Sequence, residues 1–223
     1  MRIAFPGKVC YNQGRPGETQ QSPSGSMGKG AVRMLFDKEL VREKLLNWEE
    51  TLQGYTLPSW EALPTLPLYM DQVVYLLNQY LSLPPVQEEE RIVTPAMINN
   101  YVKLKIIPAP VKKRYSREHL AYLLMVCVMK QTLNTADIRR LLPGNPDEET
   151  ARVTYAAFVG AFHGMKDYFA GEVRKAAKPV WEEDGAAVSQ LIFEASAAAN
   201  LSKLLAEQLI LLGREETEPA SGK

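Results

Sequence analysis

The amino-acid sequence predicts an all-α fold. Apolar residues recur at helical spacing through most of the chain beyond residue 34. Prolines and glycines stand between these periodic segments, at positions where helices begin or end. The exception is APVKKRYS at residues 109–116, which has room for one or two very short strands. We therefore expect helices joined by short connectors.

Composition and charge exclude several functional classes. Lys and Arg together number 26, as do Asp and Glu, so the global charge predicts no partner and any electrostatic argument is local. The longest fully apolar run, residues 120–129, is too short to cross a bilayer, and the N-terminus lacks the apolar stretch of a signal peptide. Cys10 and Cys127 form no CxxC pair, and we expect no disulfide between them. These features predict a cytoplasmic protein that does not enter the membrane.

The pattern of composition divides the chain into five regions. The first is rich in Gly, Pro, Ser and Gln without periodicity, which predicts a disordered tail. Met27 and Met34 are candidate translation starts in addition to Met1. The predicted regions are a disordered tail (1–33), a helix with a proline-rich connector (34–66), a central helical domain (67–143), a C-terminal helical region (146–212) and a second disordered tail (213–223).

Two helices are predicted before the centre of the chain. An apolar stripe over residues 40–52 indicates the first, and Gly54 ends it. The proline-punctuated connector YTLPSWEALPTLP follows at residues 55–67. The apolar segment LYMDQVVYLLNQYLSL at residues 68–83 predicts the second helix, which Pro84 closes.

Three further helices are predicted in the central region. Thr94 is a good N-cap, and Pro95 suits the first helical position that follows it. A nearly all-apolar helix spans residues 116 to about 131. A short helix follows, with Asn134 or Thr135 as its N-cap.

The last third of the sequence predicts two long helices, over residues 147–178 and 185–212. The second is rich in alanine, and its small residues allow another helix to approach closely. That partner is either the 147–178 helix of the same chain or a second subunit. We predict a homodimer through these helices, because long helices beyond a complete central domain need a function.

The helix after Thr94 has one polar side and is followed by a basic loop. Asn99, Asn100 and Lys103 share the polar side. Asn can pair with an adenine edge, and Lys can reach guanine or phosphate. From Arg91 to Arg117 the chain holds seven basic residues and no acid, and the run VKKRY suits a phosphate backbone. The alternative is an ordinary solvated helix face beside a basic loop.

The order of these parts resembles the winged helix-turn-helix of MerR-type regulators. In that family a recognition helix is followed by Pro, a basic wing, a Tyr-Ser pair, a long apolar helix and a short helix. More closely, the joined segments 57–81 and 94–120 resemble the bacterial domain-of-unknown-function family 1836, whose members are thought to be MerR-like transcription regulators. The positions that match the MerR-type pattern are Ile98, Tyr101, Leu104, Ile106, Ile107, Tyr115, Ser116, Leu120, Ile138, Leu141 and Leu142.

The sequence departs from the MerR pattern at three places. Lys105 stands where the family has Gly after the recognition helix, so it either adopts a left-handed turn or closes the helix differently. Asn99 and Asn100 replace the family's Arg and Tyr, which changes the bases that the helix could read. The wing is shorter and lacks the Asn-Gly-Tyr-Arg turn.

The resemblance implies an all-α, MerR-like winged helix-turn-helix with a minimal wing at residues 67–143, followed by long C-terminal helices. It implies a sequence-specific transcription regulator that binds double-stranded DNA, which we predict to be a repressor. The alternative is a protein–protein interaction module that keeps this fold without reading DNA. The predicted DNA-contacting residues are Thr94, Asn99, Asn100, Lys103, Lys105, Lys112, Lys113, Arg114 and Arg117.

No catalytic motif stands out in the sequence, and we expect no enzyme, no cofactor and no metal site. The chain contains two histidines, His119 and His163, which we interpret as packing or surface residues. Trp48, Trp60 and Trp181 could line a pocket for a small-molecule effector, although core packing is the simpler interpretation.

Overall fold

The computed structural model describes residues 36–82, 92–142, 144–182 and 186–213, which belong to one compact unit, 35–223. The two predicted tails lie outside this part of the chain except at Gly213, and so does Cys10. The helices are α1 (Lys38–Gly54), α2 (Met70–Leu81), α3 (Pro95–Lys103), α4 (Arg117–Met129), α5 (Thr135–Leu141), α6 (Glu148–Glu182) and α7 (Ala186–Leu212).

The all-α prediction is confirmed for these residues, and side-chain caps explain where several helices begin. The Thr94 side chain accepts a hydrogen bond from the Met97 backbone N–H, as its position before Pro95 predicts. Of the two candidate caps before α5, the structure selects Asn134, whose Oδ1 accepts from the Asp137 backbone N–H at 3.0 Å.

Several helix boundaries differ from the prediction by a few residues. The second helix begins at Met70 rather than at residue 68, because the backbone of Leu68 pairs in both directions with that of Tyr115, at 2.8 Å. The sixth continues to Glu182, beyond the predicted end at residue 178. A proline at position 179 removes one backbone hydrogen bond, and the helix ends within a turn of it.

The apolar helix α4 lies at the centre of the core. Each of its residues from His119 to Cys127 is buried, which explains why its sequence is almost continuously apolar. It packs against α2 and α6, and α2 packs against α3. From the first turns of α6, Ala151 and Tyr155 enter the same core with no exposed surface. The module around α4 is therefore completed by a helix that the sequence pattern assigns to a separate region.

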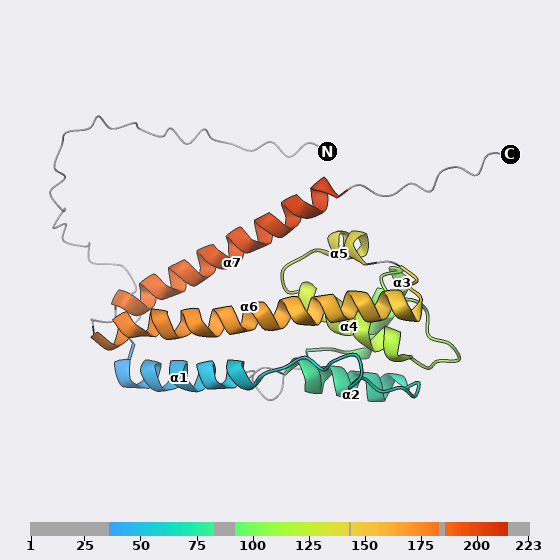
Figure 1. Ribbon diagram of the computed structural model, residues 1–223, viewed down its shortest axis with the longest axis horizontal. Coiled ribbons are helices and arrows are strands. Elements are labelled where there is room, and N and C mark those ends of the chain that lie inside the picture. Colours follow the sequence, from blue (N-terminus) through green and yellow to red (C-terminus); the bar gives the residue numbers. More distant parts are fainter. Residues whose placement is uncertain (1–35, 83–91, 143, 183–185, 214–223) are drawn as a thin grey trace. The chain divides into compact units, whose positions relative to one another are not determined.

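The first helix packs beside the C-terminal half of α6 (Figure 1). Leu52 of α1 forms a small apolar cluster with Ala170 and Val173 of α6. Glu49, which is 4% exposed, contacts the Arg174 guanidinium through its carboxylate at 2.7 Å. These contacts fix α1 to α6.

Polar side chains of α6 hold the connector that follows α1. The Tyr155 hydroxyl donates to the Pro58 carbonyl at 2.8 Å, and burial raises the pKa of Tyr155. The His163 Nε2 accepts from the Leu57 backbone N–H at 3.1 Å, so this histidine has a packing role. Trp60 is buried in the same core, next to Tyr155. Trp48 packs instead against Phe169, and the side chain of Trp181 lies outside the described residues.

The last helix, α7, is apolar on two opposite sides. Its inner side meets the rest of the chain through Val188, Ala206 and Ile210. At about 100° per residue, most of its other large apolar side chains point roughly the opposite way, although Ile192 and Leu209 do not. We call the exposed members of this opposite side the outer face of α7, and they are Phe193, Leu201, Leu204, Leu205, Leu211 and Leu212. A helix with apolar residues all round normally has partners on every side.

Among the described residues, no helix combines the length and apolar character that a membrane span requires.

Candidate nucleic-acid interface

Helix α3 has a buried side and an exposed polar side. Ile98 and Tyr101 are buried in the core and fix the rotation of the helix. The opposite side presents Ala96, Asn99, Asn100 and Lys103, all exposed, which we call the α3 stripe. Within the part of the chain that the structure describes, the amides of Asn99 and Asn100 make no hydrogen bond. They are free to pair with a ligand.

Helix α3 ends at Lys103 with Leu104 as its C-cap, and the next residue, Lys105, takes the left-handed turn with φ of 55°. Its backbone N–H donates to the Val102 carbonyl at 3.0 Å, and that of Ile106 donates to the Tyr101 carbonyl at 3.0 Å. These are the two bonds of a Schellman motif, in which the left-handed residue is usually Gly. Lys105 therefore carries backbone strain, and its side chain is exposed just beyond α3.

Substituting Gly for Lys105 is expected to stabilise the fold. A left-handed non-Gly residue costs roughly 1–2 kcal/mol, and part of the gain is offset by the greater freedom of Gly in the unfolded chain. We expect Lys105→Gly to raise the free energy of unfolding by about 1 kcal/mol in urea titrations. Lys105→Ala, which removes the charge but keeps the Cβ, is the control. An equal gain in both variants would contradict the strain argument.

The basic loop is a tight two-residue turn. The Arg114 backbone N–H donates to the Val111 carbonyl at 2.9 Å, and Lys112 and Lys113 between them have φ of 51° and 62°. This is the type I′ geometry, for which Asn-Gly is the preferred pair. We call Lys112, Lys113 and Arg114 the wing tip; all three are exposed. The very short strands expected here are reduced to isolated bridges, Val111 with Arg114 and Leu68 with Tyr115.

The wing tip is attached to the start of α2. The Arg114 guanidinium donates to the Tyr69 hydroxyl at 2.8 Å and lies 4.7 Å from the centre of that ring. At the other end of the loop, the Nδ1 of buried His119 accepts from the Ser116 backbone N–H at 3.1 Å. Burial lowers the pKa of His119, which keeps the imidazole neutral and able to accept this bond. His119 therefore helps to shape the wing.

Besides Arg114, which contacts Tyr69, two of the predicted contact residues have structural partners. Arg117 donates to the Leu63 carbonyl at 3.1 Å, and its guanidinium lies 5.5 Å from the centre of the Trp60 ring. It holds the connector against α4, and we leave it out of the interface. Thr94 caps α3 with its hydroxyl oxygen, although its O–H can still donate. The remaining predicted residues form two groups, one along α3 and one at the wing tip.

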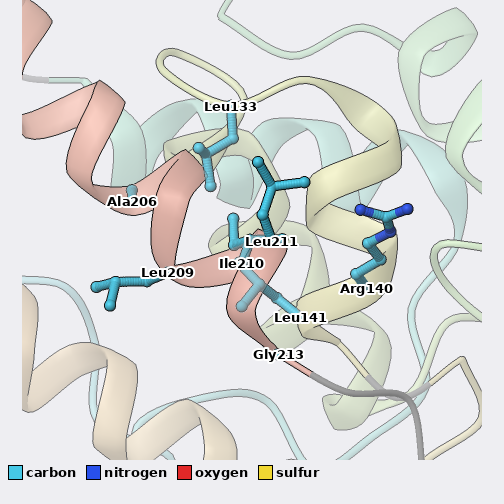
Figure 2. Close-up of a pocket in the computed structure, with 8 residues that line it drawn as sticks. All are labelled: Leu133, Arg140, Leu141, Ala206, Leu209, Ile210, Leu211 and Gly213. Carbon is cyan, nitrogen blue, oxygen red and sulfur yellow. The ribbon is translucent and has the colours of Figure 1, made fainter.

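An apolar groove of about 760 Å³ lies between α5 and α7 and was not anticipated from the sequence. Figure 2 shows leucine side chains from both helices in the groove, with the Arg140 guanidinium at one side of it. The groove could have been predicted from one feature of the sequence, the apolar character of α7 on two sides. No cluster of His, Cys, Asp or Glu suited to a metal occurs in the described residues, and Cys127 is a buried free thiol.

Part of the chain is similar to a known protein family. No curated protein and no solved structure matches the chain. Residues 58–158 match the family described as "Domain of unknown function (DUF1836)". The match extends through the first turns of α6, just beyond Tyr155, which agrees with the contribution of those turns to the core. It supports assignment of the segment from the connector through α5 and the start of α6 to the DUF1836 family.

Proposed function

We propose that this protein is a sequence-specific, double-stranded DNA-binding transcription regulator that acts as a repressor. In this proposal α2 and α3 form a MerR-like helix-turn-helix, α3 enters the major groove, and residues 111–114 are a minimal wing. The observation that carries the proposal is the exposed α3 stripe, whose free amides stand on a helix fixed by its buried side. Such a helix presents base-reading groups without rearrangement.

Charge supports the same function. Lys103 belongs to the α3 stripe, the exposed Lys105 follows the helix, and the wing tip adds three exposed cations. Between residues 92 and 117 the chain has no Asp or Glu to neutralise them. Adjacent cations of this kind suit the closely spaced phosphates of DNA, whereas the amides suit base edges.

The outer face of α7 supports assembly of two copies. A single helix-turn-helix contacts few bases, and two-fold dimers double those contacts on a palindrome. The proposed dimer places this face against a second subunit. The same face is the observation that favours the second candidate function, a protein–protein interaction module. The groove beside Arg140 offers a place for an apolar effector with an anionic group.

The salt dependence of DNA binding tests the proposal. We expect the association constant for duplex DNA to fall steeply with salt, with a slope of about −0.9 per neutralised phosphate. Replacing Lys112, Lys113 and Arg114 by Gln is expected to flatten the slope by about 0.9 for each phosphate that is no longer neutralised, on every duplex alike. Fluorescence anisotropy over roughly 50–300 mM salt measures the slope.

A matched control neutralises three exposed cations elsewhere, at Lys44, Arg152 and Lys175. This variant carries the same change in net charge and is expected to keep the wild-type slope. Absence of duplex binding at low salt would leave the interaction module as the better candidate. An equal flattening in both triple variants would show that the wing tip has no particular role.

A further inference from the structure

We propose that the α3 stripe selects A·T base pairs, with Asn99 and Asn100 as the adenine-reading residues. The inference rests on the DNA-binding function proposed above and specifies the class of site. The preference for A·T pairs depends on which hydrogen-bonding groups the fold exposes on α3. Those groups are few, and their hydrogen-bonding chemistry is restrictive.

The fold decides which side chains are available to a base pair. Ile98 and Tyr101 are 0% and 4% exposed, so the opposite side of α3 is the one that can enter a groove. The α3 stripe has the spacing i, i+3, i+4 and i+7, which places its members in a row along the helix. Asn99 and Asn100 lie in the middle of this row, and both side chains are exposed.

The chemistry of an amide favours adenine over the other bases. In the major groove adenine offers the N7 acceptor beside the N6 donor, so one Asn side chain makes two hydrogen bonds. Guanine offers two acceptors, N7 and O6, and the amide oxygen would face O6 without a proton between them. Cytosine and thymine each offer one hydrogen-bonding group, so an amide makes a single bond to either.

The neighbours of the two amides agree with this preference. Ala96, one turn before Asn100, is small and apolar, and such a side chain can contact the thymine methyl group. Helix α3 contains no Arg, the residue that most often reads guanine, and no acid, which would accept from cytosine. Lys103 is its one cation and lies at the far end of the stripe, so a guanine or phosphate contact belongs at the edge of the site.

Selection followed by atomic substitution tests the inference. The full-length protein is first used to select duplexes from a random pool, and we expect A·T pairs at the centre of each half-site. Adenines of the selected site are then replaced by 7-deazaadenine, which lacks the N7 acceptor but still pairs with thymine. We expect each substitution at a contacted adenine to weaken binding about tenfold. Replacement of guanines outside the edge contact by 7-deazaguanine is expected to have no effect.

Variants test whether Asn99 and Asn100 cause the effect of 7-deazaadenine on binding. In Asn99→Ala/Asn100→Ala the affinity for the selected site is expected to fall. The remaining affinity is expected to be the same with adenine and with 7-deazaadenine. Asn200→Ala, another exposed helical Asn, on α7, is the matched control and is expected to keep the wild-type response. Circular dichroism and thermal melting check that the double variant folds, and the isosteric Asn99→Asp and Asn100→Asp variants provide a second test if it does not.

The outcomes separate the inference from the function on which it rests. Failure to bind any duplex at low salt would overturn the proposed function. Selected sites centred on G·C pairs would overturn the inference while leaving DNA binding intact, and so would an undiminished 7-deazaadenine effect in the double variant.

Discussion

Two charges placed on the outer face of α7 are expected to convert the proposed dimer to a monomer. Leu201 and Leu205 are 65% and 62% exposed in the single chain, so their substitution by Glu removes little packing from the protomer. In the proposed dimer both positions are covered, and an unpaired buried carboxylate costs several kcal/mol. We expect Leu201→Glu/Leu205→Glu to weaken dimerisation by roughly 100-fold or more. Sedimentation velocity at micromolar concentration measures the change.

The matched control places the same two charges on the polar flanks of the helix, as Asn200→Glu/Ser202→Glu. It is expected to remain a dimer. If the wild-type chain sediments as a monomer, the dimer proposal is wrong. If the leucine variant remains a dimer, subunits associate through another surface.

A truncation complements these variants, and the structure fixes where the chain should end. Ending it near Gly144 would remove Tyr155 and Ala151 from the core and unfold the module around α4. A chain that ends at Glu182 keeps all of α6 and omits only α7 and the tail. We expect it to fold and to sediment as a monomer.

Exchange of Lys112-Lys113 for Asn-Gly is expected to stabilise the fold and weaken DNA binding at the same time. Both lysines are in the left-handed conformation, which Asn and Gly adopt at lower cost, so the free energy of unfolding is expected to rise by about 1–2 kcal/mol. Because two phosphates are then no longer neutralised, the affinity for DNA is expected to fall by roughly 60-fold at 0.1 M salt. Urea titration and fluorescence anisotropy measure the two effects.

The control for this exchange is Lys112→Gln/Lys113→Gln. It removes the same two charges but keeps a Cβ at both left-handed positions. We therefore expect it to weaken DNA binding as much as Asn-Gly does, without a gain in stability. An affinity unchanged in both variants would show that the wing tip makes no phosphate contact. A stability gain in both would show that the backbone strain is smaller than the turn geometry indicates.

The helices and several of their caps could be predicted from the amino-acid sequence alone. Thr94 before Pro95 predicts the start of α3, because a hydroxyl oxygen and a fixed proline φ both satisfy local requirements of a helix end. The continuous apolar run at residues 120–129 predicts that α4 is buried on all sides. Helical periodicity alone predicts that Asn99, Asn100 and Lys103 lie on the exposed side of α3. These features depend on neighbours within a few residues, which the sequence displays directly.

Properties that depend on distant partners became visible only in the folded chain. In the sequence Arg117 is one more cation of a basic segment. In the structure its guanidinium contacts Trp60 and the Leu63 carbonyl, which belong to residues more than fifty positions earlier. The sequence pattern places Tyr155 in a separate helical region, whereas in the structure it is part of the core around α4. The left-handed lysines at positions 112 and 113 carry no local signal, because their conformation is imposed by the elements that they join. Local pattern places side chains around one helix axis, whereas only packing between elements determines which of them remain free to bind.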